Sequence, residues 1–173
     1  DARKAQEAAK KQFESALDQF IAVTNFEGGD VEKQYRKLKG EYEDSEARAK
    51  DVHKRIADVE QVAGDLFKEW EKELGQYKSA ELRRTSQRQL QDTRSRYQKL
   101  IASLKRAEKK LDPVLAAFND RVLFLKHNLN ARAIASLRTN RAAIEADIGA
   151  LIADMNKSIA EADQFIKAMS EAK

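Results

Sequence analysis

The sequence contains no cysteine, one proline and six glycines. The absence of cysteine excludes disulfide bonds, thiol catalysis and cysteine-ligated metals. So few prolines and glycines leave few positions for sharp turns, and no stretch has the alternating β-branched pattern of a strand. No apolar run approaches the ~20 residues that a membrane-spanning helix needs. These absences leave long helices joined by few loops.

What the chain does contain agrees with this. Of its 173 residues, 42% are hydrophobic and 36% are charged, which is typical of coiled coils and long helices. The 33 basic and 29 acidic residues give a net charge of only +4, which indicates a solvated surface with many ion pairs. The chain begins at Asp1 without methionine, so we expect that an N-terminal segment is missing.

The longest regular pattern runs from Val31 to Tyr77. Apolar residues recur there at alternating steps of four and three, the heptad pattern of a helix with one buried seam. The seam positions are Val31, Tyr35, Leu38, Tyr42, Ser45, Ala49, Val52, Ile56, Val59, Ala63, Leu66, Trp70, Leu74 and Tyr77. A helix of this length is roughly 70 Å long at ~1.5 Å per residue, and its seam needs partner helices.

The segment before it has the same pattern. Its seam consists of Ala2, Ala5, Ala9, Phe13, Ala16, Phe20 and Val23. The pair Gly28-Gly29 permits the positive φ that often ends a helix, and Asp30 can cap the next one. This predicts a turn between residues 24 and 30.

A third helix is predicted from Leu82 to Leu129, with Ser79 as its N-cap. Its seam consists of Leu82, Ser86, Leu90, Thr93, Tyr97, Leu100, Leu104, Ala107, Leu111, Val114, Phe118, Val122, Leu125 and Leu129. Pro113 falls inside it, but the heptad step is kept from Leu111 to Val114, so we predict a kink and not a break.

The start of the last helix is less well marked. Asn130 can cap a helix from residue 131 to about residue 170, a turn near Thr139-Asn140 is an alternative, and one continuous long helix is another. The turn near Asn130 is favoured, because it makes a four-helix base that leaves the far hairpin tip with mostly two helices. The last seam consists of Ile134, Leu137, Ile144, Ile148, Leu151, Met155, Ile159, Ala162, Ile166 and Met169.

The fold class that follows is all-α. We predict an elongated antiparallel bundle of about four coiled-coil helices in one domain, residues 1–173, with helices near 1–23, 31–78, 82–129 and 131–170.

A basic stretch in the third helix is the sharpest chemical feature. Its cations are Arg83, Arg84, Arg88, Arg94, Arg96, Lys99, Lys105, Arg106, Lys109 and Lys110. One interpretation is a surface for phosphates or anionic lipid headgroups. The favoured interpretation is that these cations pair across the hairpin with Glu60, Asp65, Glu69, Glu71 and Glu73. Nucleic acid is disfavoured, because Tyr97 is the only aromatic residue available to stack on bases.

The stretch from Val122 to Leu137 has little charge. Its polar residues include His127, Asn128, Asn130 and Arg132, which form a candidate docking corner. The favoured interpretation is a buried helix-to-helix corner in which the asparagines cap helix ends.

No catalytic or cofactor-binding pattern occurs in the sequence. His53 and His127 lack the Glu three residues earlier that di-iron bundles use, so no metal site is predicted. No glycine-rich phosphate loop or nucleophile elbow is present. We therefore predict a protein that is not an enzyme, with no cofactor and no small-molecule substrate.

Four segments resemble a gammaproteobacterial family catalogued only as a domain of unknown function. They are SALDQFIAVTNFEGGDVEKQYRKL, KEWEKELGQY, ELRRTSQRQL and VLFLKHNLNARAIASL. The resemblance covers essentially the whole chain and implies a helical protein whose members often begin with a lipoprotein-like or secretory signal. It therefore implies a periplasmic or cell-envelope location, and it supplies no activity and no site residues.

Together these observations predict a scaffold or interaction protein of the bacterial cell envelope. Its partner is expected to be another protein or a second copy of itself. The alternative is a peripheral membrane binder that uses the basic stretch from Arg83 to Lys110 on a kinked bundle.

Overall fold

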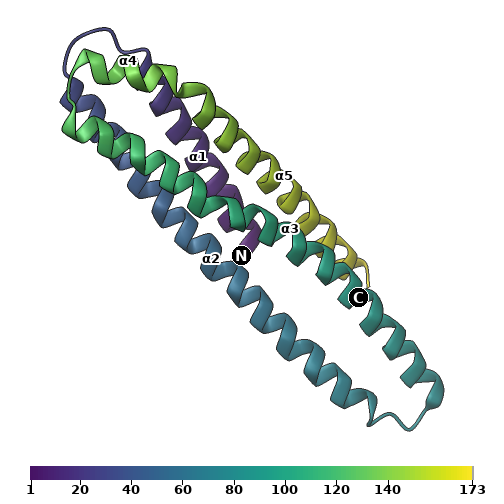
Figure 1. The fold of residues 1–173 in the computed structure, drawn as a ribbon. Coiled ribbons are helices and arrows are strands. Elements are labelled where there is room, and N and C mark those ends of the chain that lie inside the picture. Colours follow the sequence, from purple (N-terminus) through teal and green to yellow (C-terminus); the bar gives the residue numbers. More distant parts are fainter. Residues whose placement is uncertain (173) are drawn as a thin grey trace.

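The computed structural model describes residues 1–172, and all regular secondary structure in that range is helical. The helices are α1 (Ala2–Thr24), α2 (Val31–Leu74), α3 (Ala80–His127), α4 (Ala131–Thr139) and α5 (Arg141–Glu171). Figure 1 shows α1, α2, α3 and α5 lying lengthwise together in an elongated molecule. The hairpin of α2 and α3 spans the full length of the molecule. The predicted all-α class is confirmed for the described residues, and the predicted lengthwise arrangement of the helices is present.

The three predicted N-cap residues are confirmed by their capping geometry, although α3 begins at Ala80, two residues before the predicted Leu82. The side chains of Asp30, Ser79 and Asn130 each accept a hydrogen bond from the backbone N–H three residues later, with N···O distances of 3.0, 3.3 and 2.9 Å. The predicted turn before α2 uses Gly28 and Gly29 at φ values of 86° and 110°. These residues fix where the chain reverses direction.

The predicted number of about four helices is corrected to five in the described range. The hairpin near Asn130 is present, and a second break at Asn140 separates α4 from α5. The Asn140 side-chain amide donates to the Ser136 carbonyl at 3.1 Å, and its backbone N–H donates to the Leu137 carbonyl. Such local bonds compete with the regular helix pattern. As a result, the short α4 contacts α1 and α3 as well as α5 at one end of the bundle.

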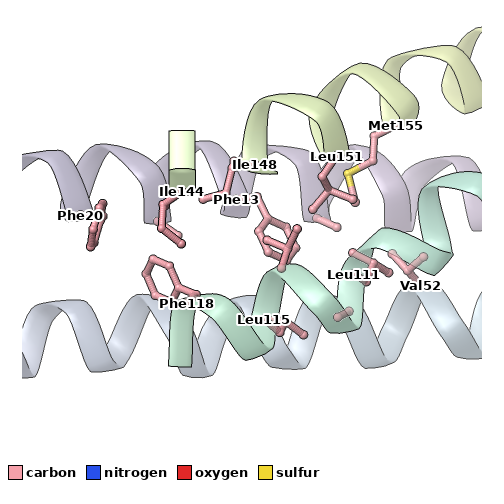
Figure 2. Packing of buried hydrophobic residues seen from close by; sticks show 14 of the residues in the cluster. Phe13, Phe20, Val52, Leu111, Leu115, Phe118, Ile144, Ile148, Leu151 and Met155 are labelled. Carbon is pink, nitrogen blue, oxygen red and sulfur yellow. The ribbon is translucent and has the colours of Figure 1, made fainter. Parts of the chain in front are cut away.

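The core lies where four helices surround it. α1 packs on α2, α2 on α3, α3 on α5, and α5 on α1. Figure 2 shows apolar side chains from these helices meeting in the space between them. Phe118 is 2% exposed, and its ring centroid lies 6.3 Å from Phe20 and 6.1 Å from Tyr42. The predicted four-helix base is therefore present, and all seven predicted seam residues of α1 are buried.

The outer part of the hairpin, from Leu66 to Leu82, departs from the predicted seam. Leu66 and Leu82 are 46% and 58% exposed, and Tyr77 is also exposed, whereas Phe67 is buried against Tyr97 at a centroid distance of 5.6 Å. The physical reason is the number of neighbours. Where α1 no longer covers α2, only the contact with α3 excludes water, and the residue nearest α3 is buried.

The structure also tests two seam positions, one helix boundary and the prediction at Pro113. Leu129 and Ile166 were predicted seam positions and are 43% and 53% exposed. Leu129 lies in the connection after α3, and Ile166 lies in the last two turns of α5. α2 ends at Leu74, earlier than the predicted residue 78. α3 continues through Pro113, so the chain does not break there, while the kink stays a prediction.

Replacing Phe118 with alanine tests whether its side chain is part of the core. Phe118→Ala is expected to lower the free energy of unfolding by about 3–5 kcal/mol, because it leaves a cavity among α1, α2 and α3. Phe124→Ala on the same helix is the matched control, because Phe124 is 41% exposed. Urea unfolding measures both, and similar small losses for the two variants would contradict the described core.

Candidate interaction surfaces

The α2–α3 hairpin extends past the first residue of α1 as a narrower projection (Figure 1). We call this part, residues 59–97, the arm. Among the described residues, the arm's tip consists of α2, α3 and their connecting turn. Fewer neighbours leave more side-chain surface in contact with solvent, and the predicted basic stretch lies partly on this surface.

Part of the basic stretch pairs across the hairpin as predicted. Arg94 Nη2 lies 2.7 Å from Glu71 Oε1, and Lys105 Nζ lies 2.5 Å from Glu60 Oε1. The Arg94 guanidinium also lies 5.2 Å from the centroid of the Phe67 ring. These contacts confirm pairing with two of the five predicted acidic partners.

Other members of the stretch have no such partner. Within the part of the chain that the structure describes, Arg83, Arg84, Arg88, Arg96 and Arg106 are exposed and form no ion pair. Arg84 and Arg88 line one shallow open depression on α3. Exposed guanidinium groups of this kind can bind carboxylates or phosphates in two-pronged geometry.

An apolar groove lies at the base of the arm. Val59, Val62, Ala63 and Leu66 of α2 form one wall, and Phe165 of α5 contributes to another. Tyr97 and Leu100 of α3 also line it, and the N-terminal residues Asp1 and Ala2 lie at it as well. Val62 is 67% exposed and Leu66 is 46% exposed, so the groove carries a small apolar patch open to solvent. The sequence analysis missed this groove, because three helices and a terminus build it together.

The predicted docking corner is mostly capping structure. Asn130 caps α4, and the Asn128 side chain donates to the Phe124 carbonyl at 2.9 Å. His127 and Arg132 are exposed. The capping roles of the asparagines are therefore confirmed. The corner is less buried than the favoured interpretation predicted, since Leu123, Phe124 and Leu129 are more than two-fifths exposed.

His53 joins α2 to α3 near Pro113. Its Nδ1 lies 2.7 Å from Glu108 Oε1, and its Nε2 lies 3.2 Å from Asp112 Oδ1. Partial burial lowers the pKa of His53, but hydrogen bonds and charge from the two carboxylates raise it by more, so the net pKa is raised. The imidazolium form can donate from both ring nitrogens, which matches this geometry.

Two polar contacts inside the bundle were not predicted. Lys110 Nζ lies 2.7 Å from the nearly buried Asp154 Oδ2 and joins α3 to α5. Ser158 of α5 donates to buried Gln6 of α1 and lies 2.9 Å from the Met155 carbonyl. Each contact connects helices that are distant in sequence, and both fix the register of α5 against its neighbours.

The depressions on these surfaces are open to solvent. The residues of the described chain provide no group of three histidine or acidic side chains suited to a metal ion. None of the helices in residues 1–172 is both long enough and apolar enough to cross a bilayer. The surfaces described above carry exposed cations, exposed apolar side chains and one apolar groove.

The His53 contact predicts a pH dependence of stability. Because the pKa is raised on folding, the contact stabilises the fold fully below about pH 6.5, and this stabilisation is lost as the pH rises through the raised value. His53→Ala should therefore lower the free energy of unfolding more at about pH 5.5 than at about pH 8.5. The control is His127→Ala at the exposed second histidine. Equal losses for His53→Ala at both pH values would contradict the assignment.

Comparison with known proteins gives a family but no activity. No curated protein and no solved structure matches the chain. A family model described as "Protein of unknown function (DUF2959)" matches residues 1–169. Since that match covers nearly the whole sequence, the chain belongs to the DUF2959 family of proteins of unknown function.

Proposed function

We propose that this protein is a non-enzymatic interaction protein, a scaffold whose contact surface is the arm. The observation that carries the proposal is the exposure of Val62 and Leu66 beside an apolar groove. Clustered exposed apolar side chains on a soluble surface commonly mark a site of protein association. The open shape of the depressions supports binding of another surface more than turnover of a small substrate.

The proposed setting is the bacterial cell envelope, in the periplasm or at a membrane. Its support is the resemblance described above, whose members often begin with a secretory or lipoprotein-like signal. A long bundle with a projecting arm suits a role in which one end is held and the other contacts a partner.

Site-specific photocross-linking in cells tests the proposal. A photoreactive amino acid at Val62 should form covalent adducts with protein, because its side chain is 67% exposed at the groove. The same amino acid at exposed Ala146 on α5 is the control. Adducts at residue 62 that are absent at residue 146 are expected. Equal labelling, or no protein adduct at residue 62, would contradict an interaction role for the arm.

A peripheral membrane binder is the second candidate. It is favoured by Arg83, Arg84 and Arg88, which are exposed without an ion-pair partner in the described residues. Basic clusters near a membrane contribute about 1 kcal/mol per residue toward binding anionic lipids.

Co-sedimentation with vesicles that contain phosphatidylserine tests this second candidate. Binding should fall in high salt and in the triple variant Arg83→Glu/Arg84→Glu/Arg88→Glu if these side chains contact lipid. A matched variant with three glutamates at exposed Lys11, Lys37 and Lys157, away from the arm, controls for total charge. Equal binding by both variants, or none by the unmodified protein, would exclude a specific basic lipid-binding surface.

A further inference from the structure

The end of the bundle opposite the arm has a surface that the proposed function leaves unused (Figure 1). It is formed by the short helix α4, the last turns of α1 and α3, and the first turns of α2. We call this part, residues 16–40 and 120–142, the α4 end. Its charge and its exposed apolar side chains both differ from those of the rest of the molecule.

The α4 end carries the whole excess of positive charge of the chain. Its two segments contain nine lysines and arginines and five acidic residues, whereas the rest of the chain contains 24 of each. Residues 121–144 contain five basic residues and no acidic one, although about one residue in six of the chain is acidic. Such a local excess of one sign complements a negatively charged partner.

The cations at the junction of α3 and α4 are free to meet that partner. Lys126 and Arg132 are exposed and form no ion pair within residues 1–172, and His127 beside them is also exposed. Arg138 and Arg141 count for less, because they line one depression together with Glu27 and Glu145.

The other acidic residues of this end are also accounted for. Asp120 lines an open depression beside Arg121, so these two charges offset each other. Asp30 and Glu32 lie at the start of α2, where the helix dipole compensates negative charge. In the ring of four helices α2 has α1 and α3 as neighbours, so its start lies diagonally across from α5.

Large apolar side chains protrude beside Lys126. Leu123, Phe124 and Leu129 are 45%, 41% and 43% exposed. They are three of the eight large apolar residues that are exposed in the described chain, and they fall within seven residues. The Asn128 side chain donates to the Phe124 carbonyl at 2.9 Å, which holds the connection that carries Leu129 against the last turn of α3. Cations and apolar side chains therefore share one edge of the α4 end.

We propose that the α4 end docks on the surface of a bilayer that contains anionic lipids. Leu123, Phe124 and Leu129 enter the headgroup region, while Lys126 and Arg132 contact lipid phosphates. Reversible attachment of a protein to a membrane commonly combines these two signals, buried apolar area and basic charge. The arm then points away from the bilayer. This inference goes beyond the proposed function and does not depend on it.

The size of the apolar patch favours lipid over a protein partner. Three large side chains that are about two-fifths exposed offer roughly 200 Å² of apolar surface, whereas a standard protein interface covers about 800 Å² per partner. The depression beside Phe124 is open, so it does not enclose a partner side chain. A bilayer is fluid and closes around protruding side chains, and its phosphates match the cations beside them.

Co-sedimentation with phosphatidylcholine vesicles, with and without phosphatidylglycerol, tests the proposal. The unmodified protein should bind the anionic vesicles and should be released by high salt. Leu123→Glu/Phe124→Glu should weaken binding at least tenfold, because it puts two charges into the inserted region. Leu82→Glu/Ile166→Glu changes two other exposed apolar residues in the same way and should leave binding unchanged. No binding to anionic vesicles, or equal losses in the two variants, would overturn the proposal.

Charge reversal then locates the lipid contact. Lys126→Glu/Arg132→Glu should weaken binding at least tenfold at low salt, because it replaces attraction to lipid phosphates by repulsion. Arg84→Glu/Arg88→Glu makes the same change in charge on the arm. A loss of binding in the arm variant alone would place the lipid contact on the arm and overturn the inference for the α4 end.

A fluorescent label measures insertion without changing a charge. The chain has no cysteine, so Leu129→Cys provides a single site for an environment-sensitive fluorophore. Its emission should shift to shorter wavelength on anionic vesicles and should be quenched by brominated lipid, whereas a label at Leu82→Cys should not respond. Circular dichroism checks that each variant keeps its helix content. A response at residue 82 alone, or at neither position, would overturn the proposal.

The outcomes separate this inference from the proposed function. Protein adducts at residue 62 without vesicle binding would keep the interaction role of the arm and reject membrane docking. Vesicle binding through the α4 end without protein adducts at residue 62 would do the reverse.

Discussion

The structure depends on a mismatch in helix length. The apolar seam joining α2 and α3 belongs to helices of 44 and 48 residues, whereas α1 and α5 have 23 and 31 residues. At ~1.5 Å per residue, helices of roughly 66–72 Å are covered by helices of roughly 35 and 47 Å. Where α1 and α5 cover α2 and α3, the four helices form a thick part with a buried core, which we call the body. Where they do not, α2 and α3 alone form the thin arm.

The arm is held together by a narrower set of contacts than the body. Phe67 and Leu90 are buried there, and the Trp70 indole N–H donates to the Ser86 hydroxyl at 2.8 Å. Two seam positions of the arm, Ser86 and Thr93, are polar, whereas the seam between α2 and α3 in the four-helix part has one polar residue, Ser45. Polar seam residues specify register but lower stability, so the arm is the part of the hairpin with the smaller local stability. Surfaces that adapt to partners commonly lie in such regions.

Local sequence signals predicted the turns well. Asp30, Ser79 and Asn130 each have a side chain that bonds within its own first turn, so their role needs no knowledge of the rest of the fold. The choice between Leu66 and Phe67 could not be made in this way. Both are large and apolar, and which one is buried depends on how many helices surround that level of the bundle.

Contacts between distant segments were equally inaccessible. The pairing of Lys110 with Asp154 requires the register of α5 against α3, which heptad spacing alone does not fix. The basic stretch was predicted as a candidate surface, but which of its cations have partners became clear only from the paired helices. The apolar groove needs residues from α2, α3 and α5 at one level, so no single segment indicates it.

Amide hydrogen exchange along α2 tests the central claim most directly. If the coverage of α2 changes along its length, residues 38–56 should exchange slowly, at rates near those set by global unfolding, and residues 66–74 should exchange much faster. Measured by mass spectrometry at a concentration too low for self-association, this contrast should lie within one continuous helix. Uniform protection from residue 38 to residue 74 would contradict an arm that is less covered than the body.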